Sequence, residues 1–133
     1  MKHTIYLAIL LFLFISCSKK ENNNSNTTPL TGTWKLTEML SDPGDGSGTY
    51  NPVQSERILI FNSNGSVSSN GSLYYMSLQT GTWESGTYSL ADSTISVKNC
   101  DDTPLPIRFI LSSNTLELLL PCIEPCKMKF NKK

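Results

Sequence analysis

Histidine is almost absent from this sequence: His3 is the only one among 133 residues. It lies in an N-terminal segment that is expected to be removed, as argued below, so the mature chain would have none. Without histidine neither a Ser-His-Asp or Cys-His catalytic arrangement nor a zinc site with histidine ligands can form. No phosphate-binding loop or dinucleotide fingerprint is present. These absences argue against an enzyme, and against a metal or an organic cofactor.

The chain has no excess of either charge, with 11 basic and 11 acidic residues. No basic stripe is present, which argues against nucleic acid as a partner. Four lysines gather near the C-terminus, at positions 127, 129, 132 and 133. We interpret them as one solvated strand face and a soluble tail. A patch for phospholipid or another polyanion is the alternative.

No apolar run is long enough to span a membrane as a helix, which needs roughly 20 residues. The longest run, Ile5–Ile15, follows the basic start Met1–His3 and ends just before Ser16-Cys17. Its length and basic flank are typical of a signal peptide. We therefore expect residues 1–16 to be a signal peptide.

Phe14-Ile15-Ser16-Cys17 resembles a lipobox, the cleavage site of lipoprotein signal peptidase. Ser16 supplies the small residue before the cut, and the Cys17 thiol can carry diacylglycerol. Two or three acyl chains anchor a protein stably. This predicts covalent attachment to a membrane through lipid, palmitate included, on Cys17. An ordinary secretory signal with an incidental cysteine is the alternative.

The residues after Cys17 predict a tether and a location. Ser18 replaces the Asp that retains lipoproteins in the inner membrane under familiar Gram-negative rules, which favours the outer membrane, on its periplasmic face or at the cell surface. Residues 17–29 contain almost nothing to bury, so this lipidated segment is predicted to be a disordered tether. The remaining residues, 30–133, suit a single domain with one modest core.

Polar and apolar residues alternate through most of this domain, the pattern of strands with one buried face. Turn-forming residues such as Asn62–Gly65 and Asn70-Gly71 separate the strands. No window has a helical period. The pattern predicts an all-β barrel or sandwich with strands near 32–39, 56–62, 65–69, 73–79, 82–90, 94–99, 106–112, 115–120 and 126–131.

A short repeat occurs in the domain: Thr31–Trp34 recurs as Thr80–Trp83, with a faint third copy at Gly86–Tyr88. Duplication of a half-barrel would explain it. We favour a simpler interpretation, in which Gly lets the backbone turn into a strand and an aromatic ring closes the core.

Several of these segments resemble one family. Gly32-Thr33-Trp34 resembles the Gly-x-Trp signature of lipocalins. Ile60–Val67 is similar to the Phe-x-x-x-Gly-x-Val hairpin of small bacterial lipocalin-like lipoproteins. The segments Gly81–Leu90 and Ile107–Leu118 follow in the same order as in these proteins. The resemblance implies a small antiparallel up-and-down barrel of about eight strands that holds a small apolar ligand.

The resemblance also implies roles for particular residues. Trp34, preceded by Gly32, would plug the closed end of the barrel as a structural residue. In lipocalins an Arg of the last strand packs over that ring, whereas this chain offers Lys127 and Lys129. We expect Tyr50, Tyr74, Tyr75 and Trp83 to line the mouth or the cavity.

Residues 41–50 would form the loop that covers the mouth in lipocalins, and their glycines predict a mobile segment. Asp45–Gly48 also suggests a calcium loop, which needs oxygen ligands at alternate positions. Pro43 replaces one expected Asp, and no Glu closes the set, so a plain loop is favoured.

Three cysteines remain after lipidation of Cys17: Cys100, Cys122 and Cys126. They allow one disulfide and one leftover thiol. Cys122 and Cys126 could close the last hairpin, but we favour a bridge involving Cys100, because it closes a longer loop and could join loops at one barrel end. Three sulfurs without histidine lack the fourth ligand of a zinc site.

Two hypotheses of function follow, and neither is an enzyme. The first is a lipid-anchored envelope protein whose barrel binds a small apolar ligand. The second is a filled barrel that binds or inhibits another envelope protein through its loops. Core volume distinguishes them, since large inward residues could fill so small a barrel: Phe61, Phe109, Leu118 and Phe130.

Overall fold

A computed structural model describes residues 29–98 and 103–133 of the chain. The expected signal peptide, the lipidation site Cys17, most of the tether and Cys100 lie outside these residues. Within the described ranges no helix has the length and apolar character needed to cross a membrane.

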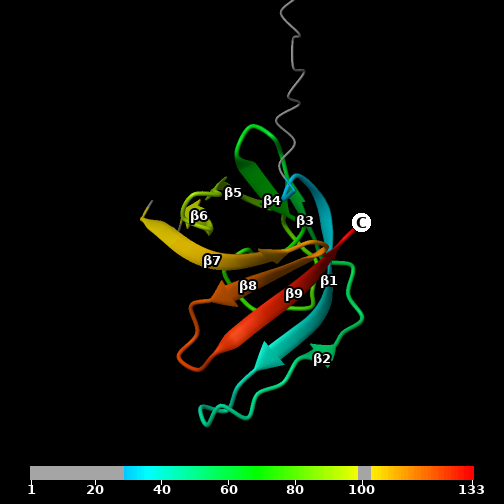
Figure 1. The fold of residues 1–133 in the computed structure, drawn as a ribbon, viewed down its shortest axis with the longest axis vertical. Coiled ribbons are helices and arrows are strands. Elements are labelled where there is room, and N and C mark those ends of the chain that lie inside the picture. Colours follow the sequence, from blue (N-terminus) through cyan, green and yellow to red (C-terminus); the bar gives the residue numbers. More distant parts are fainter. Residues whose placement is uncertain (1–28, 99–102) are drawn as a thin grey trace, which may run out of the picture.

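The described chain is all-β (Figure 1). Its strands are β1 (Gly32–Ser41), β2 (Asn51–Pro52), β3 (Ile58–Phe61), β4 (Ser66–Ser69), β5 (Glu84–Ser89), β6 (Thr94–Lys98), β7 (Pro104–Ser112), β8 (Thr115–Leu120) and β9 (Cys126–Lys132). Each barrel strand pairs antiparallel with the next, and β1 also pairs with β9. The barrel is therefore closed, with eight strands, while β2 is a short addition to the edge of β1. The predicted small antiparallel up-and-down barrel of about eight strands is confirmed.

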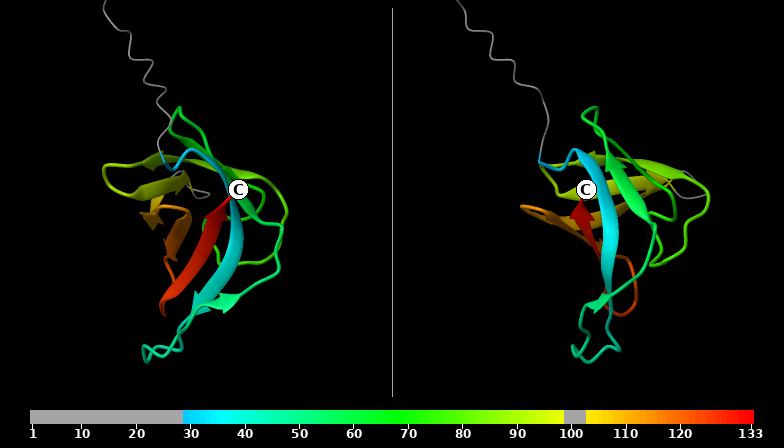
Figure 2. Two further views of the ribbon diagram at one scale, coloured as in Figure 1. Left: turned by 45° about the vertical axis from the view of Figure 1, so that its right-hand side comes forward. Right: turned by 90° about the vertical axis from the view of Figure 1, so that its right-hand side faces the viewer.

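The closing pair joins the two ends of the domain. Trp34 lies opposite Lys132, and Ser41 lies opposite Cys126. The left view of Figure 2 shows β1 and β9 side by side along their length. Closure leaves no long open edge, which is how barrels avoid edge-to-edge association.

The core follows from the alternation in the sequence. In β8 the residues alternate between intermediate and buried, so that Leu116, Leu118 and Leu120 face inward. The same period places Phe61, Phe109 and Phe130 inside. Trp34 in β1 is fully buried among them. The large residues that could fill the barrel do lie in its interior.

The antiparallel order puts the connections at two ends of the barrel. The connections 42–50, 70–83 and 121–125 lie at one end, which we call the loop end. The N–H of Asp42 donates to the carbonyl of Pro125 at 2.9 Å, which ties two of these loops together. The start of β1 and the C-terminus lie at the other end, where the Lys133 N–H donates to the Thr33 carbonyl.

One expected strand is wrong. Residues 73–79 form no strand, and 70–83 is instead a long connection between β4 and β5. The other eight expected strands coincide with the eight barrel strands to within a few residues. The reason for the exception lies in the hydrogen bonds described below.

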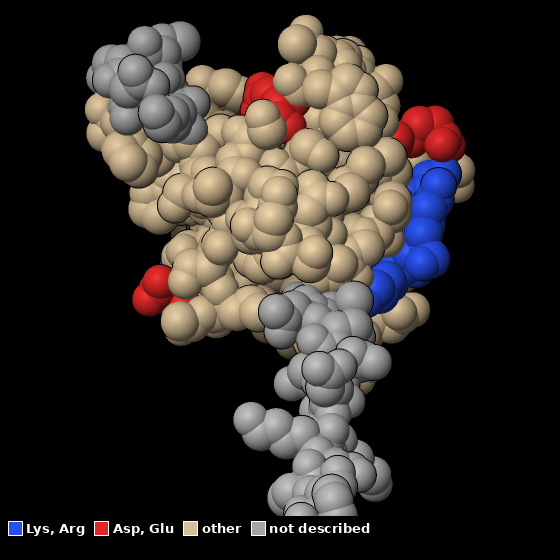
Figure 3. Space-filling model, turned by 90° about the horizontal axis from the view of Figure 1, so that it is seen from above, with Lys and Arg blue, Asp and Glu red and all other residues tan. Residues whose placement is uncertain are grey.

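Charged side chains on the barrel wall are partly paired. Lys129 contacts Glu38 at 2.9 Å, and Lys35 contacts Glu56 at 2.8 Å. Figure 3, which views the molecule from above, shows a mostly uncharged surface with basic side chains at one edge beside acidic ones. This face carries no broad basic patch.

Candidate functional site

The connection 70–83 contains a compact loop whose ends meet. The Gly81 N–H donates to the Asn70 carbonyl at 2.8 Å. A Cβ on Gly71 would lie 2.8 Å from the carbonyl oxygen of Gln79, so the two limbs approach more closely than a side chain there permits. Short loops closed at the base and packed by their own side chains are Ω-loops. We call residues 70–81 the Ω-loop.

Side chains with local hydrogen bonds hold the Ω-loop out of the sheet. The Ser72 hydroxyl accepts from the N–H groups of Tyr74 and Tyr75, both at 3.2 Å. The Glu84 carboxylate accepts from the Leu73 N–H at 2.7 Å and from the Ser72 hydroxyl at 3.3 Å. These bonds satisfy the backbone donors that a strand would give to its neighbour, which explains the absence of the expected strand.

The Ω-loop fills part of the barrel with its own side chains. Leu73 is buried in the core, and Tyr74 and Met76 pack against it. On the outer side Tyr75 and Leu78 are exposed, as is Trp83 just beyond the loop. The interior at the loop end is therefore occupied by a connection rather than by strands alone.

Arg57 holds this loop from inside the barrel. Its side chain is 1% exposed. One terminal nitrogen, Nη1, donates to the Ser77 carbonyl at 2.6 Å and lies 3.8 Å from the Met128 sulfur. The other, Nη2, donates to the Ser72 carbonyl. The guanidinium thus bridges two points of the Ω-loop.

The charge of Arg57 has no direct ionic partner among residues 29–98 and 103–133. Its Nε is buried and, within the same residues, unpaired. Burial lowers the pKa of Arg57, and the nearby charge of Glu84 opposes that shift. A buried, incompletely paired charge is costly, so its presence needs an explanation beyond packing.

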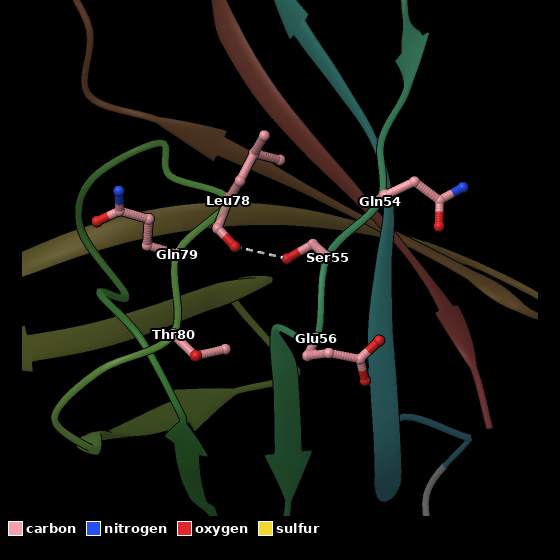
Figure 4. Close-up of a pocket in the computed structure, with 6 residues that line it drawn as sticks. All are labelled: Gln54, Ser55, Glu56, Leu78, Gln79 and Thr80. Carbon is pink, nitrogen blue, oxygen red and sulfur yellow. Dashed lines mark hydrogen bonds between the residues drawn. The ribbon is translucent and has the colours of Figure 1, made fainter.

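A groove opens where the Ω-loop meets the segment before β3 (Figure 4). It has a volume of about 520 Å³ and is lined by Gln54, Ser55, Glu56, Leu78, Gln79 and Thr80. One hydrogen bond crosses it, from the Ser55 hydroxyl to the Leu78 carbonyl at 2.7 Å. Arg57 bonds the preceding carbonyl of the same limb, that of Ser77. The buried guanidinium therefore lies close to the hydrogen bond that crosses the groove, on its interior side.

A second hollow, of about 570 Å³, lies over β4, β5 and β6. Its lining consists of Ser66, Ser85, Gly86, Thr87, Ser96, Val97 and Pro104. None of these side chains is ionisable. The hollow offers hydroxyl groups but no arrangement for acid–base or nucleophilic chemistry.

Tyr50 lies on the outer wall, away from the expected cavity. Its hydroxyl donates to Glu117 at 2.8 Å, and the Lys129 ammonium lies 3.7 Å from its ring centroid. Burial, then the hydrogen bond and charge of Glu117, raise the pKa of Tyr50. Glu117 and Lys129 alternate with inward residues of β8 and β9.

Asp42, which the sequence did not single out, organises the glycine-rich loop. Its carboxylate accepts from the N–H groups of Gly44, Gly46 and Gly48 at 2.7, 3.0 and 2.7 Å. The expected mobile segment therefore contains a hydrogen-bonded turn. These bonds hold the pKa of Asp42 below its usual value, with Gly48 contributing most.

The other predicted mouth residues lie on or beside the Ω-loop. The rings of Tyr74 and Tyr75 contact edge to face, with centroids 5.0 Å apart. Tyr74 faces the core, whereas Tyr75 and Trp83 are 67% and 55% exposed. Only Tyr74 of the four therefore faces the barrel interior.

The two copies of the Thr-Gly-Thr-Trp repeat have different environments. Trp34 of the first copy is fully buried and donates through Nε1 to the Leu30 carbonyl at 2.8 Å. Gly32 has φ +127°, a value that side chains rarely adopt. In the second copy Trp83 is exposed, and Gly81 has no positive φ. The repeat is therefore not a structural duplication.

The cysteine pairing differs from the favoured expectation. A disulfide joins Cys122 to Cys126, whose Cα atoms are 6.0 Å apart. This separation suits a disulfide without backbone movement. A bridge from Cys100 to either residue is therefore wrong, because the hairpin between β8 and β9 brings its own two cysteines together.

Arg57 and Glu84 were missed, although the sequence carries a signal for both. Leu59 and Phe61 of β3 face inward, so the same period places Arg57 inward. In β5 the inward phase of Gly86 and Tyr88 includes Glu84. Both residues could have been identified from the sequence as charged side chains at positions where the strand alternation predicts an inward-facing residue.

Residues 30–118 match the family described as "Lipocalin-like domain". Among solved structures, a lipocalin-like protein from Bacteroides uniformis is similar, at 24% identity and a TM-score of 0.49. The match covers 80% of this chain and 100% of that one. No curated protein matches the chain.

Proposed function

Because this chain belongs to the lipocalin-like domain family, we propose that it is a non-enzymatic, lipid-anchored protein of the cell envelope that binds a small apolar or amphipathic molecule. The binding space is the part of the barrel interior that the Ω-loop now occupies. The lipid anchor is on Cys17, and the outer membrane is the location.

The observation that carries this proposal is that some of the side chains filling the barrel interior come from a connection and not from a strand. Strand residues such as Phe61 and Phe130 are fixed by the sheet, but Leu73, Tyr74 and Met76 come from a connection. A connection can leave the barrel without breaking a strand ladder. Loops of this kind have low local stability and often cover binding sites.

Polar contacts support the same conclusion. The Ω-loop supplies two backbone carbonyls to Arg57, which is buried in the interior. A ligand with a polar head group could take their place. The groove beside Ser55 and Leu78 is the route by which a ligand would enter the barrel interior. Only one exposed hydrogen bond crosses it, so little has to break for the groove to open.

Binding is tested on the mature chain, residues 17–133 with Cys17→Ser, secreted through a non-lipidating signal. Native mass spectrometry should show a co-purified small molecule, or stoichiometric uptake of a ten-carbon amphiphile. A bare protein that takes up no probe would contradict the proposal. That result would mean that the Ω-loop fills the barrel interior permanently, as in the second hypothesis of a filled barrel.

A second function is favoured by one specific feature of the Ω-loop region. Tyr75, Leu78 and Trp83 are exposed, and aromatic residues such as the first and the last are enriched at protein interfaces. A filled barrel would present them to another envelope protein. Cross-linking from a photoreactive residue at position 75 in intact cells tests this, with position 90, another exposed apolar site, as the control.

The anchor has its own test. Cells fed an alkyne analogue of palmitate should label the wild-type chain and the Cys100→Ser variant, but not Cys17→Ser. An inhibitor of lipoprotein signal peptidase should cause the uncleaved precursor to accumulate. Equal labelling of Cys17→Ser would overturn the assignment of the lipid to this residue.

A further inference from the structure

The Ω-loop offers the barrel interior a particular set of hydrogen-bonding groups. Two carbonyl oxygens, of Ser72 and Ser77, accept from Arg57. Two donors, the Leu73 N–H and the Ser72 hydroxyl, bond to Glu84. A molecule that replaces the loop must satisfy both residues, because buried polar groups without partners are costly.

One basic and one acidic side chain, Arg57 and Glu84, face this polar centre without contacting each other directly. Ser72 links the two side chains, since its carbonyl accepts from Arg57 and its hydroxyl donates to Glu84. The negative charge of Glu84 also opposes the fall in the Arg57 pKa that burial causes. A carboxylate ligand would place a second negative charge beside Glu84. An ammonium ligand would place a second positive charge beside Arg57. The pair therefore favours a neutral head group.

The unpaired Nε of Arg57 adds a further donor. It is buried and lies beside Gly71, where a Cβ would come within 3.0 Å of it. The Ω-loop leaves this donor without an acceptor within the described residues. A carbonyl oxygen has two lone pairs, so the oxygen of one head group can accept from Nε together with a terminal nitrogen of Arg57, which the loop does not do.

We propose that Arg57 and Glu84 form the head-group subsite for a neutral amphiphile that both accepts and donates hydrogen bonds, namely an acyl compound with a carbonyl beside an N–H or O–H, such as a carboxamide. Its alkyl chain takes the space of Leu73, Tyr74 and Met76. This inference rests on the proposed function and names the chemical class of its ligand.

Three ten-carbon probes separate the possibilities at pH 7.5: decanamide, methyl decanoate and decanoic acid. The amide both donates and accepts, the ester only accepts, and the acid is ionised. We expect decanamide to bind the mature chain at least about tenfold more tightly than either of the others, because a hydrogen bond at a charged group is worth about that factor. Calorimetric titration gives the three constants.

Each outcome decides a different claim. Equal affinity for the three probes would overturn the head-group subsite while leaving the ligand-binding function intact. Tighter binding of decanoic acid than of decanamide would also overturn the subsite. Failure of all three to bind would overturn the proposed function, and the subsite with it.

Charge variants test the two residues directly. Glu84→Gln removes the negative charge, so decanoic acid should then bind at least about tenfold more tightly than to the wild type. Arg57→Gln should weaken decanamide by a similar factor. The matched control is Arg108→Gln, the other arginine of the chain, which is exposed on β7 and should change nothing. Unchanged probe preference in Glu84→Gln would contradict the proposal.

A hydrogen-exchange measurement on the wild-type protein tests the proposal even if the variants do not fold. Saturating decanamide should displace the Leu73 N–H from Glu84 and raise its exchange rate at least about tenfold. The Phe109 N–H, which bonds Ser93 at 2.9 Å far from the Ω-loop in the chain, is the internal reference. Leu73 protection that does not change at saturation would overturn the displacement of the loop.

Discussion

Lys132 lies over the indole ring of Trp34, with its Nζ 5.3 Å from the ring centroid. The same ammonium donates to the Pro29 carbonyl, and Trp34 donates to Leu30. The last strand, the first strand and the residues before it are joined at this one point. The sequence pointed to Lys127 or Lys129 for packing over Trp34, whereas Lys132 is the lysine that lies over the ring.

This contact predicts a modest, charge-dependent stabilisation. Lys132→Met should lower the free energy of unfolding by about 0.5–1 kcal/mol, the usual size of an exposed cation–π contact, whereas Lys132→Arg should retain it. Urea denaturation measures both. Lys133→Met, an exposed neighbour, is the control and should change the free energy by less than about 0.5 kcal/mol. Equal losses in the Met and Arg variants of Lys132 would contradict a cation–π contact.

The carboxylate of Asp42 should make the 42–50 loop sensitive to acid. Hydrogen bonds from Gly48, Gly46 and Gly44 lower its pKa in the folded state below the ordinary 3.8. Stabilisation of the loop is therefore complete above pH 3.8 and is lost as the pH falls through the lower, folded pKa. Proton NMR of the three glycine amides against pH measures this.

Asp42→Asn should loosen the same amides at neutral pH, because the charge is gone. Asp92→Asn, in the turn between β5 and β6, is the control and should leave them unchanged. A folded pKa of Asp42 at or above the ordinary value would show that the carboxylate does not hold the loop.

The Cys122–Cys126 disulfide closes a short loop, so its removal should have a limited cost. The chain-entropy relation gives about 2 kcal/mol for the free energy of unfolding. The double variant Cys122→Ser, Cys126→Ser tests this by denaturation. Under non-reducing conditions iodoacetamide should label Cys100 in the unfolded mature chain and neither of the other two. Labelling of Cys122 or Cys126 with Cys100 protected would restore the rejected pairing.

Gly86 in β5 should resist substitution, whereas Gly81 should not. A Cβ on Gly86 would lie 2.4 Å from the Ser96 carbonyl oxygen of the neighbouring strand. Gly86→Ala should therefore lower the free energy of unfolding by about 1–3 kcal/mol, since backbone must move. Gly81→Ala meets nothing within 4 Å and should change it by less than about 0.5 kcal/mol. Similar losses for both would refute the steric explanation.

Tyr50→Phe should leave the binding of decanamide unchanged, because this ring lies on the outer wall. It should lower stability slightly, by about 1 kcal/mol, through loss of the bond to Glu117. Because the folded pKa of Tyr50 is raised, that stabilisation is present below pH 10 and declines above it. A large loss of ligand affinity would place Tyr50 in the site after all.

Much of the fold could be predicted from the sequence because inward and outward residues alternate in the barrel strands. In β8 the pattern Thr115–Leu120 defines the strand and its buried face together. The outer position of Tyr50 could not be found this way. It depends on a loop that folds back to Glu117 and Lys129 across the chain.

The Ω-loop escaped prediction for a different reason. Its apolar residues, Leu73 to Leu78, read as a strand, but Ser72, Asn70 and Glu84 satisfy the local backbone. Asn70 accepts from the Ile58 N–H at 2.8 Å and donates to the Glu56 carbonyl at 2.9 Å. Such competition between side chains and a strand ladder depends on tertiary positions, which periodicity does not contain.

The pairing of β1 with β9 also determines how the domain can fold. Thr37 contacts the Lys129 carbonyl although the two residues are 92 positions apart. The hydrogen-bond ladder of β1 is therefore complete only after β9, near the C-terminus, has paired with it. Contacts so distant in sequence slow folding, because a long loop must close before they form. Loss of the final strand would leave β1 and β8 with open edges, so truncation at the C-terminus should produce an aggregating chain rather than a smaller domain.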